Sequence, residues 1–334
     1  MVVIQSYPLA VMMCVLTMLC WGSWANTQKL ASKEWKFQLF YWDYCIGVVL
    51  LSLIAALTMG SIGSVGRSFV RDLRQATGAA LGFAFLGGVV FNVANILLVA
   101  AIDIAGMSVA FPIGIGIALV EGVVINYIFK PQGNPILLFA GVAGIAIAIV
   151  IDALAYKKLA GGEQKTTGKG IVISVAAGVL MGLFYYLVQR GVVADFTNPE
   201  AGKMGPYAAV FIFSIGVFLS SFLWNTIVMA RPFTGEPVPL GDYFKKGNLR
   251  LHLIGIVGGA IWGVGMSVNN VAAGTAGPAI SYGLGQGATM VAAFWGVFIW
   301  KEFKAAPPQT NKLLALMFVF YAVGLALLIT AKII

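Results

Sequence analysis

The segment Gly87–Lys130 decides the fold, because the chain contains it twice. It reads GGVVFNVANILLVAAIDIAGMSVAFPIGIGIALVEGVVINYIFK. A shift of 171 positions places it on Gly258–Lys301, which reads GGAIWGVGMSVNNVAAGTAGPAISYGLGQGATMVAAFWGVFIWK, and 11 of the 44 positions are then identical. In both copies a Gly-Gly pair opens an apolar helix, a small-residue turn follows, and a glycine-rich helix ends in an aromatic–Lys pair. We interpret the two segments as a duplicated membrane hairpin, one in each half of a transporter.

The composition is that of a protein that crosses a membrane many times. Hydrophobic residues make up 60% of the chain and charged residues 10%, whereas a soluble domain carries about 25% charged residues. The net charge of +9 comes from Lys and Arg in short loops between apolar runs, with no basic face interleaved with aromatic residues, so we exclude a nucleic-acid partner. Cys14, Cys20 and Cys45 match no zinc or redox spacing.

Ten segments reach the length of about 20 apolar residues that a helix needs to cross a bilayer. They are Pro8–Ala25, Leu39–Met59, Ala76–Ala101, Gly106–Phe129, Pro135–Leu154, Gly170–Gly191, Pro206–Met229, Leu251–Ala273, Pro278–Trp300 and Leu313–Lys332. The sequence therefore predicts an all-α integral membrane protein of ten transmembrane helices. The first apolar run has no basic residue before it, so we expect a membrane helix there and not a cleaved signal peptide.

Five helices in each half is an odd number, so the second copy has to cross the membrane in the opposite sense. We predict two inverted five-helix repeats, 1–156 and 170–334, joined by a linker over 157–169, and able to open a central site to either side in turn. Loops that follow odd-numbered helices hold 14 of the 21 Lys and Arg residues, and the other side holds seven, among them Arg67, Arg71 and Arg74. This bias places the linker in the cytoplasm and both termini outside a plasma (inner) membrane.

Two carboxyl groups inside the apolar segments are candidates for binding a coupling proton, because a charge in hydrocarbon is costly unless it is paired or hydrated. Glu121 lies in the fourth helix with no basic residue near it in sequence. The alternative is a carboxyl group held protonated by helix packing. Asp43 lies about one turn into the second helix, where we predict a proton relay or a gate near the cytoplasmic mouth. The alternative is an interfacial carboxylate paired with Lys29, Lys33 or Lys36.

Carboxamide and aromatic side chains predict a solute site between the helices. Carboxamides both donate and accept hydrogen bonds, and aromatic rings stack on a flat or sugar-like ligand. The predicted solute-binding residues are Trp21, Asn92, Asn95, Tyr185, Trp262, Asn269, Asn270, Tyr282 and Gln286. The alternatives are hydrogen bonds between helices for the carboxamides and interfacial anchoring for the aromatic residues.

The remaining motifs do not indicate a phosphate-binding, metal or catalytic site. The glycine-rich strings have no strand before them, so they indicate close helix packing and not a phosphate loop. His252 is the only histidine, and with no second histidine or carboxylate in register it is a poor metal ligand. No Ser or Cys nucleophile with a base is discernible. We expect no enzyme activity, no cofactor and no metal site.

Four stretches resemble the ureide permease group of the drug/metabolite transporter superfamily: LCWGSWANTQKL, LFYWDYCIG, GGVVFNVANILLVAAIDIAGMSVAF and EGVVINYIF. The rhamnose–proton symporter and glucose/ribose uptake groups are near relatives of the same architecture. The resemblance implies proton-coupled uptake of a small polar solute. It also implies a cavity lined by the first, third, fourth, sixth, eighth and ninth helices, with the fifth and tenth peripheral. Plant ureide permeases have a much longer central loop, and its absence here suggests a bacterial-type member.

Three functional hypotheses follow. The first is an importer of a sugar, ureide, nucleobase or nucleoside, driven by a proton or sodium gradient. The second is an exporter of metabolites, amino acids or drugs with the same fold. The third, a membrane-embedded enzyme or assembly protein, is disfavoured by the lack of a metal or nucleophile constellation. The sequence leaves the oligomeric state open, a homodimer included.

Overall fold

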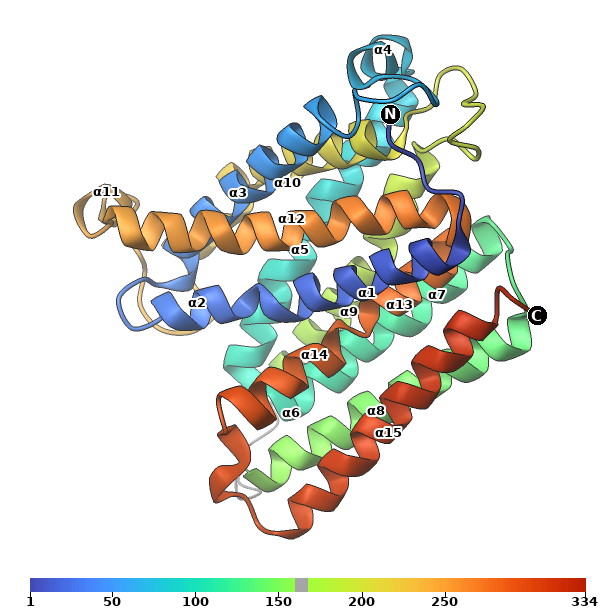
Figure 1. Cartoon of the computed structure of the whole chain (residues 1–334). Helices are drawn as coiled ribbons and strands as arrows, with labels where there is room; N and C mark the ends of the chain where they lie inside the picture. Colours follow the sequence, from blue (N-terminus) through green and yellow to red (C-terminus); the bar gives the residue numbers. More distant parts are fainter. Residues whose placement is uncertain (160–167) are drawn as a thin grey trace.

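The computed structural model of the chain describes residues 1–159 and 168–334. In these residues the regular structure is helical, apart from one isolated bridge between Val192 and Met204. Ten of the described helices are long and apolar enough to cross a membrane. The prediction of an all-α membrane protein with ten transmembrane helices is confirmed (Figure 1).

The spans begin and end within a few residues of the predicted segments. They are Tyr7–Ala31 (α1 and α2), Phe37–Leu57 (α3), Gly78–Ala105 (α5), Met107–Phe129 (α6, η1 and α7), Pro135–Leu159 (α8), Gly168–Arg190 (α9), Pro206–Ala230 (α10), Leu249–Ala276 (α12), Pro278–Ile299 (α13, α14 and η2) and Gln309–Thr330 (α15). The composite spans divide into α1 Tyr7–Ser23, α2 Ala25–Ala31, α6 Met107–Ala110, η1 Phe111–Ile115, α7 Gly116–Phe129, α13 Pro278–Gln286, α14 Ala288–Phe294 and η2 Trp295–Ile299. The short elements between spans are α4 Phe69–Gln75, α11 Asp242–Lys245 and η3 Glu302–Ala305.

The predicted linker 157–169 is only partly described. Its first residues extend α8 to Leu159, and its last residues begin α9 at Gly168. The rest, 160–167, lies outside the described residues. The division into two repeats stays a prediction.

Glycines let pairs of helices approach until their backbones touch. A Cβ on Gly259 of α12 would lie 1.9 Å from the carbonyl oxygen of Tyr44 in α3. A Cβ on Gly88 of α5 would lie 2.0 Å from the carbonyl oxygen of Phe213 in α10. The two glycines are 171 positions apart, so the third and eighth spans use the same position to pack closely against the seventh and second.

A single glycine makes the turn between the third and fourth spans of each half. Gly106 follows α5 with φ 74°, and Gly277 follows α12 with φ 88°. This part of conformational space favours glycine, because a Cβ is strained there. The two junctions occupy equivalent positions of the aligned segments, and each reverses the direction of the chain.

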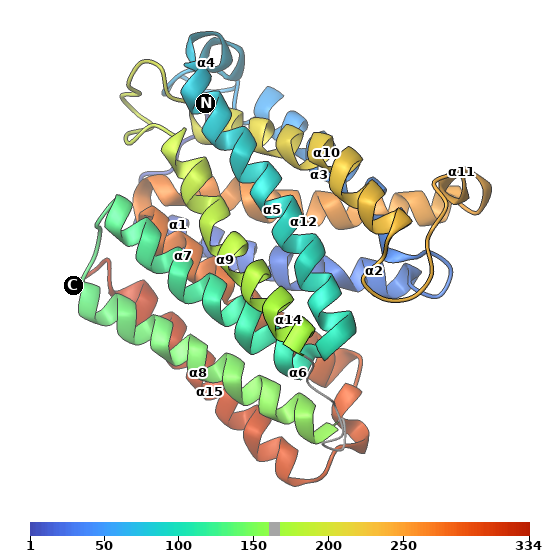
Figure 2. The ribbon, with the colours of Figure 1, turned by 180° about the vertical axis from the view of Figure 1, so that it is seen from behind.

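The fifth and tenth spans pair with each other. A Cβ on Gly141 of α8 would lie 2.8 Å from the carbonyl oxygen of Gly324 in α15. Figures 1 and 2 show α8 and α15 side by side along one edge of the molecule, on the far side of the bundle from α3 and α10. Neither α8 nor α15 lines the cavity described below.

We expect Gly259→Ala to lower the melting temperature of the detergent-solubilised protein, because the methyl group has no room against the α3 backbone and such overpacking costs about 1–3 kcal/mol. Gly82→Ala is the matched control on α5, since no atom lies within 4 Å of its added Cβ. That variant should melt at or above the wild-type temperature. Equal melting temperatures for both variants would contradict the close crossing of α3 and α12.

Candidate functional site

A cavity of about 210 Å³ lies between the first, third, fourth, sixth, eighth and ninth spans. At about 30 Å³ for each water molecule, it has room for about seven waters. Among the residues that the structure describes, no charged side chain lines it. The cavity therefore suits a small, uncharged ligand.

Aromatic rings form one wall of the cavity around Trp262, which lies at the middle of α12. The ring centroid of Phe91 lies 4.4 Å from that of Trp262, and Trp21 stacks on Trp262 at 5.7 Å with an angle of 12° between the rings. Phe213 stacks behind Trp262 at 5.8 Å. Because the rings already pack on one another, the wall is formed without a ligand.

A few polar groups supply hydrogen bonds to this largely apolar cavity. The lining includes the carboxamides of Asn95 on α5 and Gln286 at the end of α13. Asn95 uses its Nδ2 to donate to the hydroxyl of Tyr41 at 3.3 Å, which leaves its carbonyl oxygen for a ligand. Each of these carboxamides has N–H donors and a carbonyl acceptor, whereas the Nε1–H of Trp21 is buried against Gly265 of α12. The cavity thus offers both donors and acceptors.

The structure divides the predicted solute-binding residues into two groups. The residues that line the cavity are Trp21, Asn95, Trp262 and Gln286. The residues that lie outside its lining are Asn92, Tyr185, Asn269, Asn270 and Tyr282. All members of the second group are buried. Their part in solute binding stays a prediction.

The carboxamides of the second group make the hydrogen bonds between helices that were considered as the alternative. Asn92 accepts from the hydroxyl of Tyr41 at 2.9 Å and donates to the hydroxyl of Ser220 at 2.8 Å. Asn270 accepts from Nε2 of Gln189 at 2.8 Å. These contacts join α3, α5 and α10, and then α9 and α12.

Glu121 lies near the middle of the fourth span but outside the cavity lining. Its side chain is partly exposed and packs against Gly182 of α9, where an added Cβ would lie 3.2 Å from the carboxyl carbon. Within the described residues it makes no hydrogen bond or ion pair. Its role in proton coupling stays a prediction.

Asp43 is buried in a cluster that the sequence did not indicate. Its carboxylate accepts from the hydroxyl of Tyr243 at 2.5 Å and from Nε1 of Trp35 at 3.3 Å. Nδ1 of His252 lies 3.0 Å from Oδ1 of the carboxylate. The lysines considered as partners of Asp43 do not pair with it, and Lys29 instead pairs with Glu302 at the same end of the molecule.

In the sequence, His252 has no second histidine or carboxylate in register, and its expectation as a poor metal ligand stays a prediction. In the folded chain it meets the carboxylate of Asp43, which is 209 positions away and lies on another helix. The sequence feature that reflects this contact is the row of glycines on α12, which lets α3 approach closely. A Cβ on Gly255 would lie 2.4 Å from Cβ of Asp43, so α3 crosses α12 at this point.

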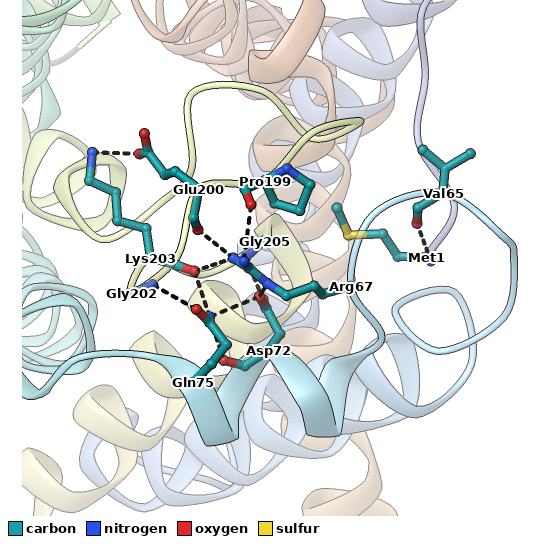
Figure 3. Close-up of polar contacts among 10 residues, drawn as sticks. All are labelled: Met1, Val65, Arg67, Asp72, Gln75, Pro199, Glu200, Gly202, Lys203 and Gly205. Atoms are coloured by element: carbon teal, nitrogen blue, oxygen red, sulfur yellow. Dashed lines mark hydrogen bonds and ion pairs between the residues drawn. The ribbon is translucent and has the colours of Figure 1, made fainter.

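At the opposite end of the molecule a guanidinium group joins two connections (Figure 3). Arg67 donates from Nε to Asp72 at 2.9 Å. Its terminal nitrogens donate to the carbonyl oxygens of Pro199, Glu200 and Lys203 at 3.1, 2.9 and 2.6 Å. One side chain from the connection between α3 and α4 therefore binds the connection between α9 and α10.

Two further side chains strengthen this contact, which we call the Arg67 clamp (Arg67, Asp72, Gln75 and residues 199–205). Gln75 donates to the carbonyl oxygen of Lys203 at 2.8 Å and accepts from the backbone N–H of Gly202 at 2.6 Å. Asp72 accepts from the backbone N–H of Gly205. The amino-terminal nitrogen of Met1 donates to the carbonyl oxygen of Val65 at 2.7 Å beside it (Figure 3).

Comparisons with known proteins place these features in a family. The family model described as Ureide permease matches residues 40–169 and 160–331. Ureide permease 1 of Arabidopsis thaliana is 24% identical over 393 aligned residues, covering 99% of each chain. Ureide permease 3 of the same plant is 27% identical over 264 residues, which cover 71% of this chain and 77% of the relative. These relatives are named as permeases and not as enzymes.

A solved crystal structure has the same fold. It superposes with a TM-score of 0.59 at 17% identity, and the match covers 96% of this chain and 98% of the other. At this identity the likeness concerns the fold alone.

We expect Arg67→Lys to lower the melting temperature clearly, because an ammonium group cannot reach the four acceptors that the guanidinium fork binds. A lost hydrogen bond to a charged group costs about 1.5–3 kcal/mol. Arg71→Lys, on the exposed side of α4, is the control and should leave the melting temperature unchanged. An unchanged value for Arg67→Lys would show that the clamp adds nothing to stability.

The two asparagines of α5 should respond differently to alanine. Asn92→Ala removes hydrogen bonds to α3 and α10, so we expect a lower melting temperature. Asn95→Ala removes a cavity group with one long hydrogen bond, so we expect a smaller change in stability. Thermal unfolding in one detergent compares the two, and a larger loss for Asn95→Ala would argue against this assignment.

Proposed function

Because the chain belongs to the ureide permease family, we propose that it is a secondary transporter that imports a small, uncharged polar solute by alternating access, driven by a proton gradient. The relatives' names make ureides the first solutes to test. Sugars, nucleobases and nucleosides have the same hydrogen-bonding character and form the second set. We place the chain in the drug/metabolite transporter superfamily and in the plasma (inner) membrane.

The observation that carries the proposal is the cavity at the centre of six spans. A transported solute has to be desolvated within the bilayer, so it needs a pocket of its own size with a few hydrogen-bonding groups. The cavity has this character: aromatic rings on one wall, three carboxamides (Gln28, Asn95 and Gln286) and no charged lining residue in the described part of the chain. A net charge on the solute would go uncompensated there.

Two features support alternating access. The cavity reaches Gln28 and Ile102 near the end of the molecule that carries α11. Toward the other end, the rings around Trp262 and the Arg67 clamp separate it from the opposite face. We propose that this conformation faces the cytoplasm, as the distribution of Lys and Arg predicts. The equivalent glycines of the two halves support the inverted repeat that would relate it to an outward-facing conformation.

The direct test is solute movement in proteoliposomes. Purified protein should concentrate a labelled ureide inside vesicles when the outside is acidic, and should catalyse exchange of the same solute with no gradient. Failure of exchange with every solute of both sets, by protein that keeps its melting transition, would exclude the proposal. Net flux only in the opposite direction to the proton would favour the exporter considered as the alternative.

We expect Trp262→Ala to abolish binding of the transported solute, since it removes the central ring of the cavity wall. The matched control is Trp224→Ala, because Trp224 lies on α10 with 36% of its surface exposed and does not line the cavity. The measurement is the rise in melting temperature on adding solute, which only a ligand of the folded protein produces. Loss of that rise in both variants, or in neither, would contradict the assigned site.

A further inference from the structure

A second hollow lies beside the cavity at the α11 end. It has a volume of about 240 Å³, and Val99 of α5 lines both spaces. Its other walls include Phe37 at the start of α3 and residues 232–236 of the connection between α10 and α12. We call this hollow the vestibule. The cavity and the vestibule thus share a lining residue on α5.

The same connection is fastened to the bundle through α11. The hydroxyl of Tyr243 donates to Asp43 of α3. The Tyr243 ring also lies 4.7 Å from the ring of His252 and 5.9 Å from that of Trp35. Phe233 and Val238 pack against the bundle at the α10 side of the connection. Outside the contacts above α11 is largely exposed, so the Asp43 cluster is what holds the α11 part of the connection against the helices.

We propose that Asp43 and His252 form a proton-binding site that sets how firmly the α10–α12 connection is held over the vestibule. The inference rests on the proposed transport function only for its consequence, not for the site itself. The two residues differ in their exposure to water: the Asp43 side chain is 1% exposed, and the His252 side chain is 26% exposed. The imidazole is therefore the member that exchanges protons with water.

The proton has a defined place in this geometry. An ionised carboxylate only accepts hydrogen bonds, so a neutral His252 facing it donates from Nδ1. Nε2, which has no hydrogen-bond partner among the described residues, is then the nitrogen that accepts a proton from the aqueous side. Uptake at Nε2 turns the hydrogen bond into an ion pair without disturbing the bond from Tyr243. Proton binding thus strengthens the cluster, and proton release loosens the connection.

Other ionisable groups around the pair do not account for a response near neutral pH. Burial, with Asp43 beside it, raises the pKa of Tyr243 above its usual range. At the rim, Arg250 pairs with Glu34 at 3.2 Å and Lys246 pairs with Asp242 at 2.7 Å. On α3 itself the Cys45 thiol contacts the hydroxyl of Ser221. Of these types, histidine alone ordinarily titrates between about pH 5 and about pH 8.

The site also connects to the cavity through one turn of α3. Tyr41 precedes Asp43 by two residues and is hydrogen-bonded to Asn95 in the cavity wall. Tyr44 follows Asp43, and its ring lies 4.8 Å from that of Trp24, another lining residue. A shift of Asp43 therefore displaces side chains that back the cavity.

The test follows the mobility of the connection with a nitroxide on Gly241→Cys, the residue before α11. Its added Cβ has no atom within 4 Å, and the three native cysteines are buried, so the label attaches at one place. In the full-length protein, electron paramagnetic resonance should show a more mobile label at about pH 8 than at about pH 6. In His252→Gln, which keeps a donor but cannot take up the proton, the mobility should not depend on pH.

Two further variants make the result decisive. Glu34→Gln, which alters a rim ion pair, should keep the wild-type pH response. Asp43→Asn should leave the label mobile at both pH values, and it serves if His252→Gln does not fold. A pH-independent wild-type signal, or a wild-type response in His252→Gln, would overturn the proposal. The readout needs no solute, so a protein with the pH response that exchanges no solute of either set would exclude the transport function alone.

Discussion

The packing of Phe91 against Trp262 is the constraint on which the rest of the structure depends. Each ring lies at the midpoint of a 28-residue helix, α5 or α12, and the two residues occupy the same position in the aligned segments. An aromatic pair of this kind adds about 0.5–1.5 kcal/mol beyond the area it buries. Its larger effect is geometric. The contact fixes how α5 meets α12, and the cavity occupies the space left on one side of the two rings.

Sequence periodicity predicted the spans well and the neighbours of each side chain poorly. Apolar length alone located all ten helices, because the bilayer imposes it on each span. The row of glycines on α12 indicated close packing, and α3 crosses there. By contrast, periodicity states which residues share a face of a helix and not what that face meets. Asn92 and Asn95 are one turn apart, yet one bonds α10 and the other borders the cavity.

The Asp43 cluster could not be predicted from sequence periodicity. Its members come from the start of α3, from α11, from the start of α12 and from the turn before α3, and only the folded chain joins them. The resemblance to ureide permeases placed attention on Asp43 but not on its partners. A buried carboxylate needs hydrogen-bond donors, and here they come from side chains far away in the sequence.

The two ends of the bundle are held by different chemistry. At one end a guanidinium group binds peptide carbonyls, an arrangement whose charge is constant at any physiological pH. At the other end a carboxylate, an imidazole and a phenol hold a short helix in place. One end thus relies on a cation that keeps its charge, while the other includes an imidazole that can gain one.

The junctions at Gly106 and Gly277 should resist proteases and escape antibodies. Each joins two long helices through one residue, so neither corner presents a loop. A protease needs several extended residues to bind, and an antibody needs a protruding epitope. Neither junction offers such a segment. Cleavage and antibody recognition should concentrate on the connection before α4, on residues 191–205 and on the segment around α11, and an inserted tag belongs in those places.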